Sequence, residues 1–114
     1  MTTATTKPIS REVLENAARV IKCLGHPLRL RLLEIMERGG EHNVSELQAF
    51  SGATQSAVSE QLGILRGHGV VASRRDGMFM HYRITEPRVF RILACVRDCD
   101  IIDRATEALS GRTA

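Results

Sequence analysis

The sequence is poor in aromatic residues: its 114 residues include three Phe, one Tyr and no Trp. Stacking platforms for single-stranded nucleic acid depend on aromatic side chains, and long-stranded β-sandwiches usually contain many, so both classes are disfavoured. No apolar run approaches the roughly 20 residues that a membrane-spanning helix needs. The opening segment MTTATTKPIS lacks the apolar stretch of a signal peptide, so we expect a cytoplasmic protein with no membrane partner.

Cysteine is also scarce, and its count of three is odd. In a reducing compartment three cysteines do not make a disulfide framework; they are buried packing residues, metal ligands or redox thiols. Apolar residues make up 43% of the chain and charged residues 25%, which is ordinary for one globular domain. The net charge of +3 fits local contact with DNA, although many unrelated proteins share it.

Apolar periodicity and capping residues predict five helices and one β-hairpin. The helices are expected at 10–24, 27–38, 44–50, 54–66 and 87–109, and the strands at 70–75 and 78–85. Ser10, Asn43 and Thr54 are the expected N-caps. Asp76-Gly77 is a two-residue hairpin signal in which both residues are expected to adopt positive φ. We therefore expect one domain at 10–109 between tails at 1–9 and 110–114.

The short helices at 44–50 and 54–66 flank a tight turn at Gly52, which is the arrangement of a helix-turn-helix. A hairpin directly after it, at about 70–85, makes a winged variant. The predicted fold is mainly α with a β-hairpin wing, in the order ααααββα. Helical spacing directs Val58, Leu62 and Leu65 inward, and it directs Ser56 and Ser59 outward. Short polar side chains at the leading end of a helix suit the DNA major groove, and a solvated face is the alternative.

Arginine side chains gather on the segment that follows. Arg66 flanks the helix at 54–66, and Arg74 and Arg75 lie beside the hairpin tip. These cations are placed to contact phosphates on either side of a groove, which would make binding dependent on salt. The alternative is an edge strand whose charges prevent aggregation.

Four segments in order resemble the ArsR/SmtB family of winged-helix repressors: GHPLRLRLLEIM, VSEL, TQSAVSEQLGILRGHGVV and RRDGMFMHYRIT. The resemblance spans about residues 20–96. It implies a homodimer, paired through helices 10–24 and 87–109, that binds an inverted-repeat operator in double-stranded DNA and is released by an effector. It carries DNA contacts onto Thr54, Gln55, Ser56, Ser59 and Gln61. The family usually has His where this chain has Gln61, but Gln also hydrogen-bonds to bases, so we expect the contact to persist with a changed operator preference.

The effector sites usual in that family are incomplete here. Asn43, Ser45 and Gln48 stand where the helix-3 metalloid site has thiolates. Arg88 interrupts the zinc site at the start of the last helix, and Glu34 replaces the helix-2 cysteine of the persulfide sensors. Any effector is therefore expected to act elsewhere, on the cysteines that remain.

Cys95 and Cys99 are four residues apart, so their sulfur atoms are expected on one face of helix 87–109. Cys23, late in the first helix, is placed to join them from either subunit. Three thiolates suit a soft ion such as trivalent arsenic or antimony, so the predicted inducer is arsenite-like and no cofactor is obligatory. Sensing of reactive sulfur or thiol oxidation, and simple packing of the cysteines, are the alternatives.

Two other function classes stay open from the residues alone. One is a winged-helix DNA-binding dimer without an effector, and the other is a winged helix used as a protein-interaction module. Catalysis is not expected, because Gly25 and Pro27 break the chain between Cys23 and His26, and no oxyanion hole is evident.

Overall fold

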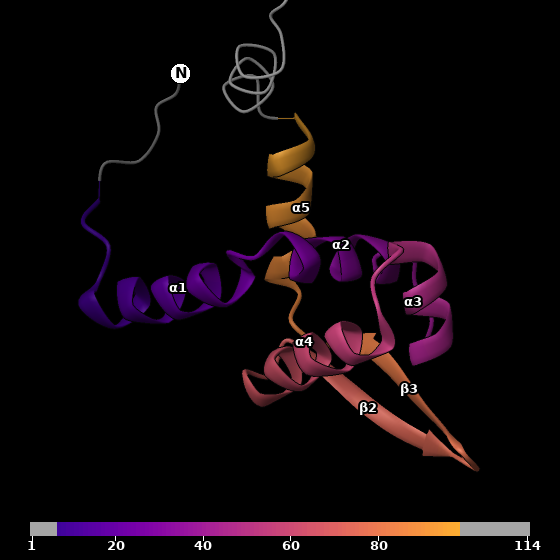
Figure 1. The fold of residues 1–114 in the computed structure, drawn as a ribbon. Helices are drawn as coiled ribbons and strands as arrows, with labels where there is room; N and C mark the ends of the chain where they lie inside the picture. The colour runs from indigo at the N-terminus through magenta and orange to yellow at the C-terminus, as the bar shows by residue number, and fades with distance from the viewer. Residues whose placement is uncertain (1–6, 99–114) are drawn as a thin grey trace, which may run out of the picture.

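The computed structural model describes residues 7–98, which form five helices and a three-stranded antiparallel sheet (Figure 1). In chain order the elements are α1 (Arg11–Leu24), α2 (Pro27–Met36), β1 (His42–Asn43), α3 (Val44–Ser51), α4 (Gln55–Gly67), β2 (Val71–Asp76), β3 (Phe79–Ile84) and α5 (Arg88–Asp98). The expected helices and hairpin are present; the rest of the expected helix 87–109 and the tail 110–114 lie outside the described residues. Each helix in the described range is too short or too polar to cross a membrane.

Local hydrogen bonds explain where the helices begin. Ser10 Oγ and Thr54 Oγ1 each accept from the amide three residues ahead, at 3.2 and 3.1 Å. Asn43 and Glu46 form a reciprocal capping box, in which each side chain accepts from the other residue's amide, at 2.8 and 2.9 Å. These bonds satisfy amides that the first turn of a helix leaves unpaired. The three predicted N-caps are therefore confirmed.

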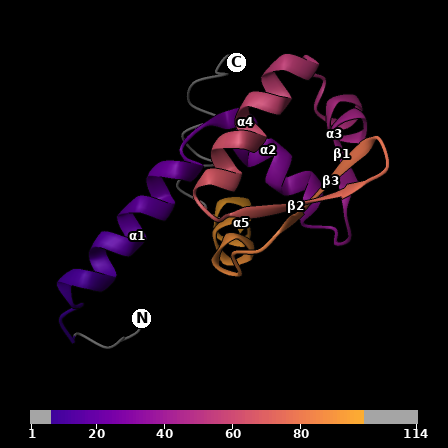
Figure 2. The same ribbon diagram turned by 90° about the horizontal axis from the view of Figure 1, so that it is seen from below.

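The apolar core lies where α2, α3 and α4 pack against each other and against the sheet (Figure 2). Its buried side chains are Cys23, Leu24, Leu32, Leu33, Met36, Leu47, Val58, Leu62, Leu65, Val70, Val71, Val89 and Leu93. Burying one Leu or Val side chain contributes about 1.5–3 kcal/mol, so the three buried apolar residues of α4 hold that helix firmly. The opposite side of α4 faces outward as a consequence.

The sheet contains one strand that the sequence did not indicate. Its order is β1-β3-β2, and β1 consists only of His42 and Asn43, which pair with Tyr82 and His81 of β3. A two-residue strand is too short to show alternation of polar and apolar residues. The strand therefore adds to the predicted order of elements, and it anchors the start of α3 to the wing.

The turn of the wing lies one residue later than predicted. Asp76 pairs with Phe79, so the two residues of the loop are Gly77 and Met78. Gly77 has a φ of 64°, and no non-glycine residue in the described part of the chain has a positive φ. The prediction of positive φ at Asp76 was wrong. The observed signs are those of a type II′ turn, which favours glycine at its first central position.

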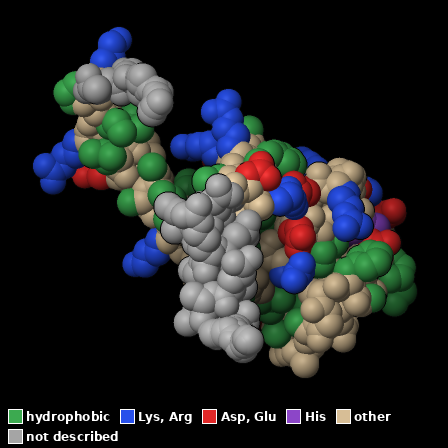
Figure 3. Space-filling model, turned by 90° about the horizontal axis from the view of Figure 1, so that it is seen from above, with side chains coloured by type: hydrophobic (Ala, Val, Ile, Leu, Met, Phe, Trp, Pro, Cys, Tyr) green, Lys and Arg blue, Asp and Glu red, His purple; other side chains and the backbone are tan. Residues whose placement is uncertain are grey.

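Helix α1 projects from the rest of the molecule as an arm (Figures 1 and 2). Its last turn enters the core, where Cys23 and Leu24 are each only 3% exposed. Further out, Val13, Leu14 and Ile21 remain 55%, 52% and 63% exposed. Figure 3 shows hydrophobic side chains gathered along this arm. An apolar stripe of this kind in water indicates a surface for association.

Candidate nucleic-acid interface

Helix α4 presents one polar face to solvent. The chain passes from α3 to α4 through Gly52, whose φ of 78° is the left-handed conformation that ends many helices. Val58, Leu62 and Leu65 are fully buried beneath α4. The exposed residues on the outer side of α4 include the predicted contacts Gln55, Ser56 and Ser59, together with Glu60 and Gly63. The predicted division between inner and outer residues is therefore found, with Gln61 as the exception.

The leading end of α4 is rich in short hydrogen-bonding groups. Thr54 is exposed there; its Oγ1 accepts from the helix backbone, which leaves the hydroxyl hydrogen to donate elsewhere. The hydroxyls of Ser56 and Ser59 both donate and accept, as does the Gln55 amide. A helix N-terminus also favours an anion such as phosphate. This end of α4 therefore combines short polar groups of the kind that contact base edges with a helix terminus of the kind that favours a phosphate.

Gln61 lies on the inner side of α4, so the base contact predicted for it does not fit this structure. Its side chain is 9% exposed, and its Oε1 accepts a hydrogen bond from Arg29 Nε at 2.7 Å. Position 61 comes three residues after Val58 and four before Leu65, a spacing that places it on the buried side. Helical spacing could thus have corrected the resemblance. Arg29, 32 residues away, carries no local signal of this pairing.

The arginines predicted to contact DNA lie on α4 and β2. Arg66 Nη1 donates to Ser73 Oγ at 3.2 Å, a bond that joins α4 to β2. Arg74 forms an ion pair with Glu41, with 2.6 Å between Nη2 and Oε1. The hydrogen bond from Arg74 lowers the pKa of the Glu41 carboxyl. Arg75 is exposed next to the wing turn. Arg74 donates to Glu41 through Nε and Nη2 and its side chain is 50% exposed, so part of its guanidinium remains accessible from solvent.

The described cysteines lie in different surroundings. Cys23 is buried in the core, where desolvation raises the pKa of its thiol and the charge of Arg29 offsets part of that rise. Cys95 is exposed on α5. Cys99 lies outside the described residues. Within residues 7–98, no group of three or more His, Cys, Asp or Glu side chains is arranged to hold a metal ion. Of the three cysteines in the predicted thiolate site, the described residues include Cys23 and Cys95.

The fold and the polar face of α4 define a winged helix-turn-helix regulator, and solved structures support this class. The chain is similar to the AntR antimony-specific transcriptional repressor, with a TM-score of 0.75, 30% identity, and coverage of 92% of this chain and 99% of that one. It is also similar to a homodimeric winged helix-turn-helix DNA-binding domain from Mycobacterium bovis, with a TM-score of 0.67, 28% identity, and coverage of 96% and 100%.

Sequence comparison identifies the family. The family model described as "Bacterial regulatory protein, arsR family" matches residues 26–73. An uncharacterised HTH-type transcriptional regulator of Mycobacterium tuberculosis strain H37Rv is 45% identical over 82 residues, which cover 70% of each chain. The chain belongs to the arsR family of bacterial regulators, and the predicted membership is confirmed. It is a DNA-binding transcriptional repressor and not an enzyme.

Proposed function

We propose that the chain acts as a homodimer that binds an inverted-repeat operator through α4 and the wing, and that an effector acting on the cysteines of α5 releases it. The polar face of α4 carries the proposal for DNA. Gln55, Ser56 and Ser59 are exposed on a helix whose other side is fixed in the core. A rigid helix with short polar groups can enter the major groove without reordering. Arg66 and Arg75, beside it, supply cations for the flanking phosphates.

A homodimer paired through α1 and α5 accounts for apolar side chains that a single subunit leaves in water. Leu14 and Ile21 on α1 are more than half exposed, and Val96 on α5 is 38% exposed. Covering such surface contributes about 25 cal/mol per Å². The neighbour from Mycobacterium bovis is described as homodimeric, which supports the same assembly here. A two-fold dimer reads half-sites about one helical turn of DNA, or a multiple of it, apart, which requires an inverted repeat.

A thiophilic effector at α5 is the second part of the proposal. Cys95 is exposed on α5, and Cys99 follows one helical turn later in the sequence. Neighbouring thiolates select soft ions, such as trivalent arsenic or antimony, over hard ones. The neighbour AntR is described as antimony-specific, which supports an inducer of this chemical class. A zinc site at the start of α5 is disfavoured, because the Glu86 carboxylate there is paired with Arg88 at 2.9 Å.

Cys23 is assigned a packing role in this proposal. Its thiol is 3% exposed, and burial raises its pKa, so both access and thiolate formation are disfavoured. The ion would then take Cys95, Cys99 and a third ligand from solvent or from the partner subunit. Sensing of reactive sulfur by the α5 cysteines is the alternative that the same exposed thiol allows.

Fluorescence anisotropy of DNA from upstream of the gene, titrated with the reduced protein, tests both parts. We expect binding that weakens steeply with added salt, and release at about one arsenite per subunit. Cys95→Ser and Cys99→Ser should bind the DNA and lose this release. Cys23→Ser is the matched control, and it should bind and release like the wild type.

Other outcomes separate the alternatives. If binding does not depend on salt concentration, the assignment of the outer side of α4 as a DNA-binding surface is wrong. Release that survives both α5 substitutions locates the sensor elsewhere, and release that Cys23→Ser abolishes returns Cys23 to the ligand set. If operator binding is unchanged by arsenite but is lost on addition of polysulfide, the reactive-sulfur alternative is favoured.

A further inference from the structure

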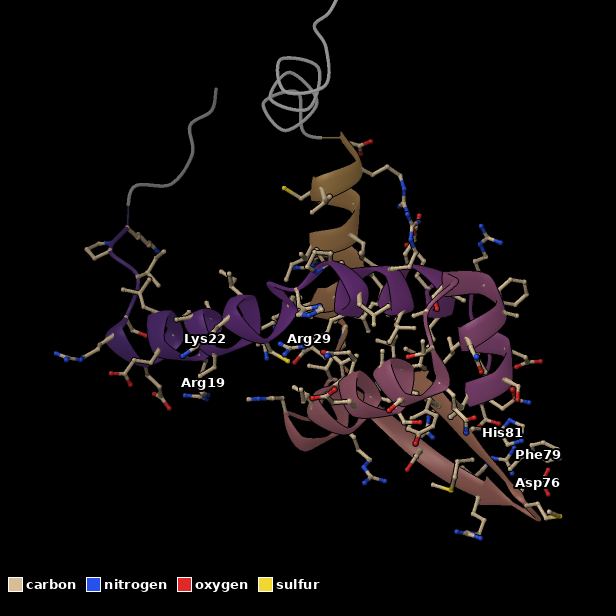
Figure 4. All side chains as sticks on the ribbon, in the orientation of Figure 1. Arg19, Lys22, Arg29, Asp76, Phe79 and His81 are labelled. Atoms are coloured by element: carbon tan, nitrogen blue, oxygen red, sulfur yellow. The ribbon has the colours of Figure 1, made fainter. Side chains whose placement is uncertain are left out.

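The guanidinium of Arg29 connects three helices at one point. Arg29 lies in the first turn of α2 and is partly buried. Its Nε donates to Oε1 of Gln61 in α4, and its Nη1 donates to the backbone carbonyl of Cys23 in α1, both at 2.7 Å. Figure 4 shows Arg29 between the end of α1 and α4. One side chain therefore hydrogen-bonds both to α4 and to the end of the α1 arm.

The contact with Cys23 holds the end of α1. The last four carbonyls of a helix have no amide partner within that helix, and Cys23 is the penultimate residue of α1. Arg29 supplies a donor to this carbonyl, and a cation at a helix C-terminus also complements the helix dipole. Cys23 and Leu24 are buried at the same place. Arg29 thus binds α1 where the arm enters the core.

The contact with Gln61 holds α4. Among the described residues, Gln61 is the polar residue that is buried together with the apolar core. Burying its amide without a hydrogen-bond partner would be unfavourable. Val58 and Leu65, on the same side of α4, fix its depth through apolar packing that has little directionality. The hydrogen bond from Arg29 is directional, so it restricts the rotation of the helix as well.

We propose that Arg29 is a positioning residue for operator binding, and that its two hydrogen bonds fix the orientation of α4 relative to the end of α1. A guanidinium is planar and presents its N–H groups in a fixed fork, so the directions to Gln61 and to the Cys23 carbonyl are set together. Gln61 then serves DNA binding from inside the protein. The inference rests on the proposed function, in which α4 reads the operator.

A small rotation of α4 is enough to matter. The outer side chains of α4 lie about 5–6 Å from the helix axis. A rotation of about 15° around that axis moves their tips by about 1.5 Å, which takes a hydrogen bond to a base out of range. Loss of the Arg29 contact should therefore weaken operator binding even in a folded dimer.

The test compares variants of the full chain by anisotropy on the same operator, at a temperature well below unfolding, with the dimer verified by size-exclusion chromatography. Arg29→Met and Gln61→Leu should each weaken binding about tenfold, and the double variant should be no weaker than the poorer single variant. Arg31→Met is the matched control: it removes an arginine two residues away that pairs with Glu34 on the surface, and it should bind like the wild type.

Gln61→Glu separates positioning from base reading. A carboxylate at position 61 keeps an acceptor for Arg29 and adds charge to the bond, so binding should stay within about threefold of the wild type. A carboxylate aimed at a base edge or a phosphate would instead repel the DNA. In the Arg29→Met background, Gln61→Glu should no longer bind the operator better than Gln61→Leu. If Arg29→Met does not fold, the comparison of Gln61→Leu with Gln61→Glu still decides.

Three results would overturn the inference: Gln61→Leu binding like the wild type, Gln61→Glu binding no better than Gln61→Leu, or Arg31→Met losing as much as Arg29→Met. If the wild type does not bind upstream DNA in a salt-dependent manner, the proposed function itself fails. That outcome is visible before any variant is compared.

Discussion

A cysteine reacts as its thiolate, so the surroundings of each thiol decide its chemistry. Cys23 and Cys95 belong to the same small domain but differ in exposure. Cys23 is buried because α1 ends inside the core, whereas Cys95 is exposed on α5. The sequence predicted that Cys23 joins the pair Cys95 and Cys99, and it contained no sign that Cys23 is buried. The difference between a buried Cys23 and an exposed Cys95 follows from where the helices end and pack.

Alkylation rates should reveal this difference. Burial raises the pKa of the Cys23 thiol, so at a pH near 8 its thiolate fraction is lower than in the unfolded chain, and access is blocked as well. We expect iodoacetamide to modify Cys95 at least ten times faster than Cys23, as measured by mass spectrometry of peptides from the native protein. Raising the pH toward the elevated pKa should speed the reaction of Cys23.

The same reaction in guanidinium chloride is the control, since both thiols should then react at similar rates. Similar rates in the native protein would contradict the burial of Cys23 and would return it to the candidate ligands.

At the scale of elements, α4 combines two faces with different tasks. Its buried side attaches it to the core through apolar residues and Arg29, and its outer side leaves Gln55, Ser56 and Ser59 exposed. The wing is tied to the same helix by the bond between Arg66 and Ser73. Helix and wing therefore form one unit that presents polar and cationic groups together.

Acidic substitutions on the outer side of α4 should abolish operator binding without affecting assembly. Ser56→Glu and Ser59→Glu each place a carboxylate where we expect DNA, and repulsion from phosphates should weaken binding by at least a hundredfold in anisotropy. Both side chains are exposed, so stability should change by less than about 0.5 kcal/mol.

Ser45→Glu is the matched control, because Ser45 is exposed in the first turn of α3, at the end of that helix remote from the turn into α4. It should bind the operator nearly as well as the wild type. Full binding by Ser56→Glu and Ser59→Glu would show that α4 is not the reading helix.

For the whole molecule, the arm of α1 is the feature that a single subunit leaves incomplete. Its outer residues stay exposed, while its last turn is fixed to the core by Cys23, Leu24 and Arg29 (Figures 1 and 4). In the proposed dimer, the arm contacts the second copy and also contacts α4 through Arg29. The relative placement of the two recognition helices then depends on this connection.

A charge on the arm should therefore prevent dimerisation. Ile21 is 63% exposed on α1, and Ile21→Glu would bury a carboxylate in the proposed interface. We expect monomers by sedimentation equilibrium and a loss of operator affinity of at least tenfold, since two half-sites are no longer bound together. Phe50→Glu is the matched control for the sedimentation measurement, because Phe50 on α3 is 67% exposed and lies outside the proposed interface. Dimers of Ile21→Glu as stable as the wild type would place the interface elsewhere.

Features that depend on nearby residues could be predicted before the fold was known. The caps at Ser10, Asn43 and Thr54 and the buried series on α4 follow from hydrogen bonds and spacings within one helix. The motifs also determined the family, because they occur in the right order and at the right spacing. These are local properties, and short stretches of chain specify them.

Features that join distant parts of the chain came from tertiary packing. The hydrogen bond between Gln61 and Arg29, the pairing of β1 with β3, and the difference in exposure between Cys23 and Cys95 depend on how helices and strands pack. Contacts across 30 residues or more leave no periodic trace in the sequence, because their partners are chosen by packing in space. Helical spacing alone could have placed Gln61 on the buried side of α4, but no sequence pattern indicated Arg29 as its partner.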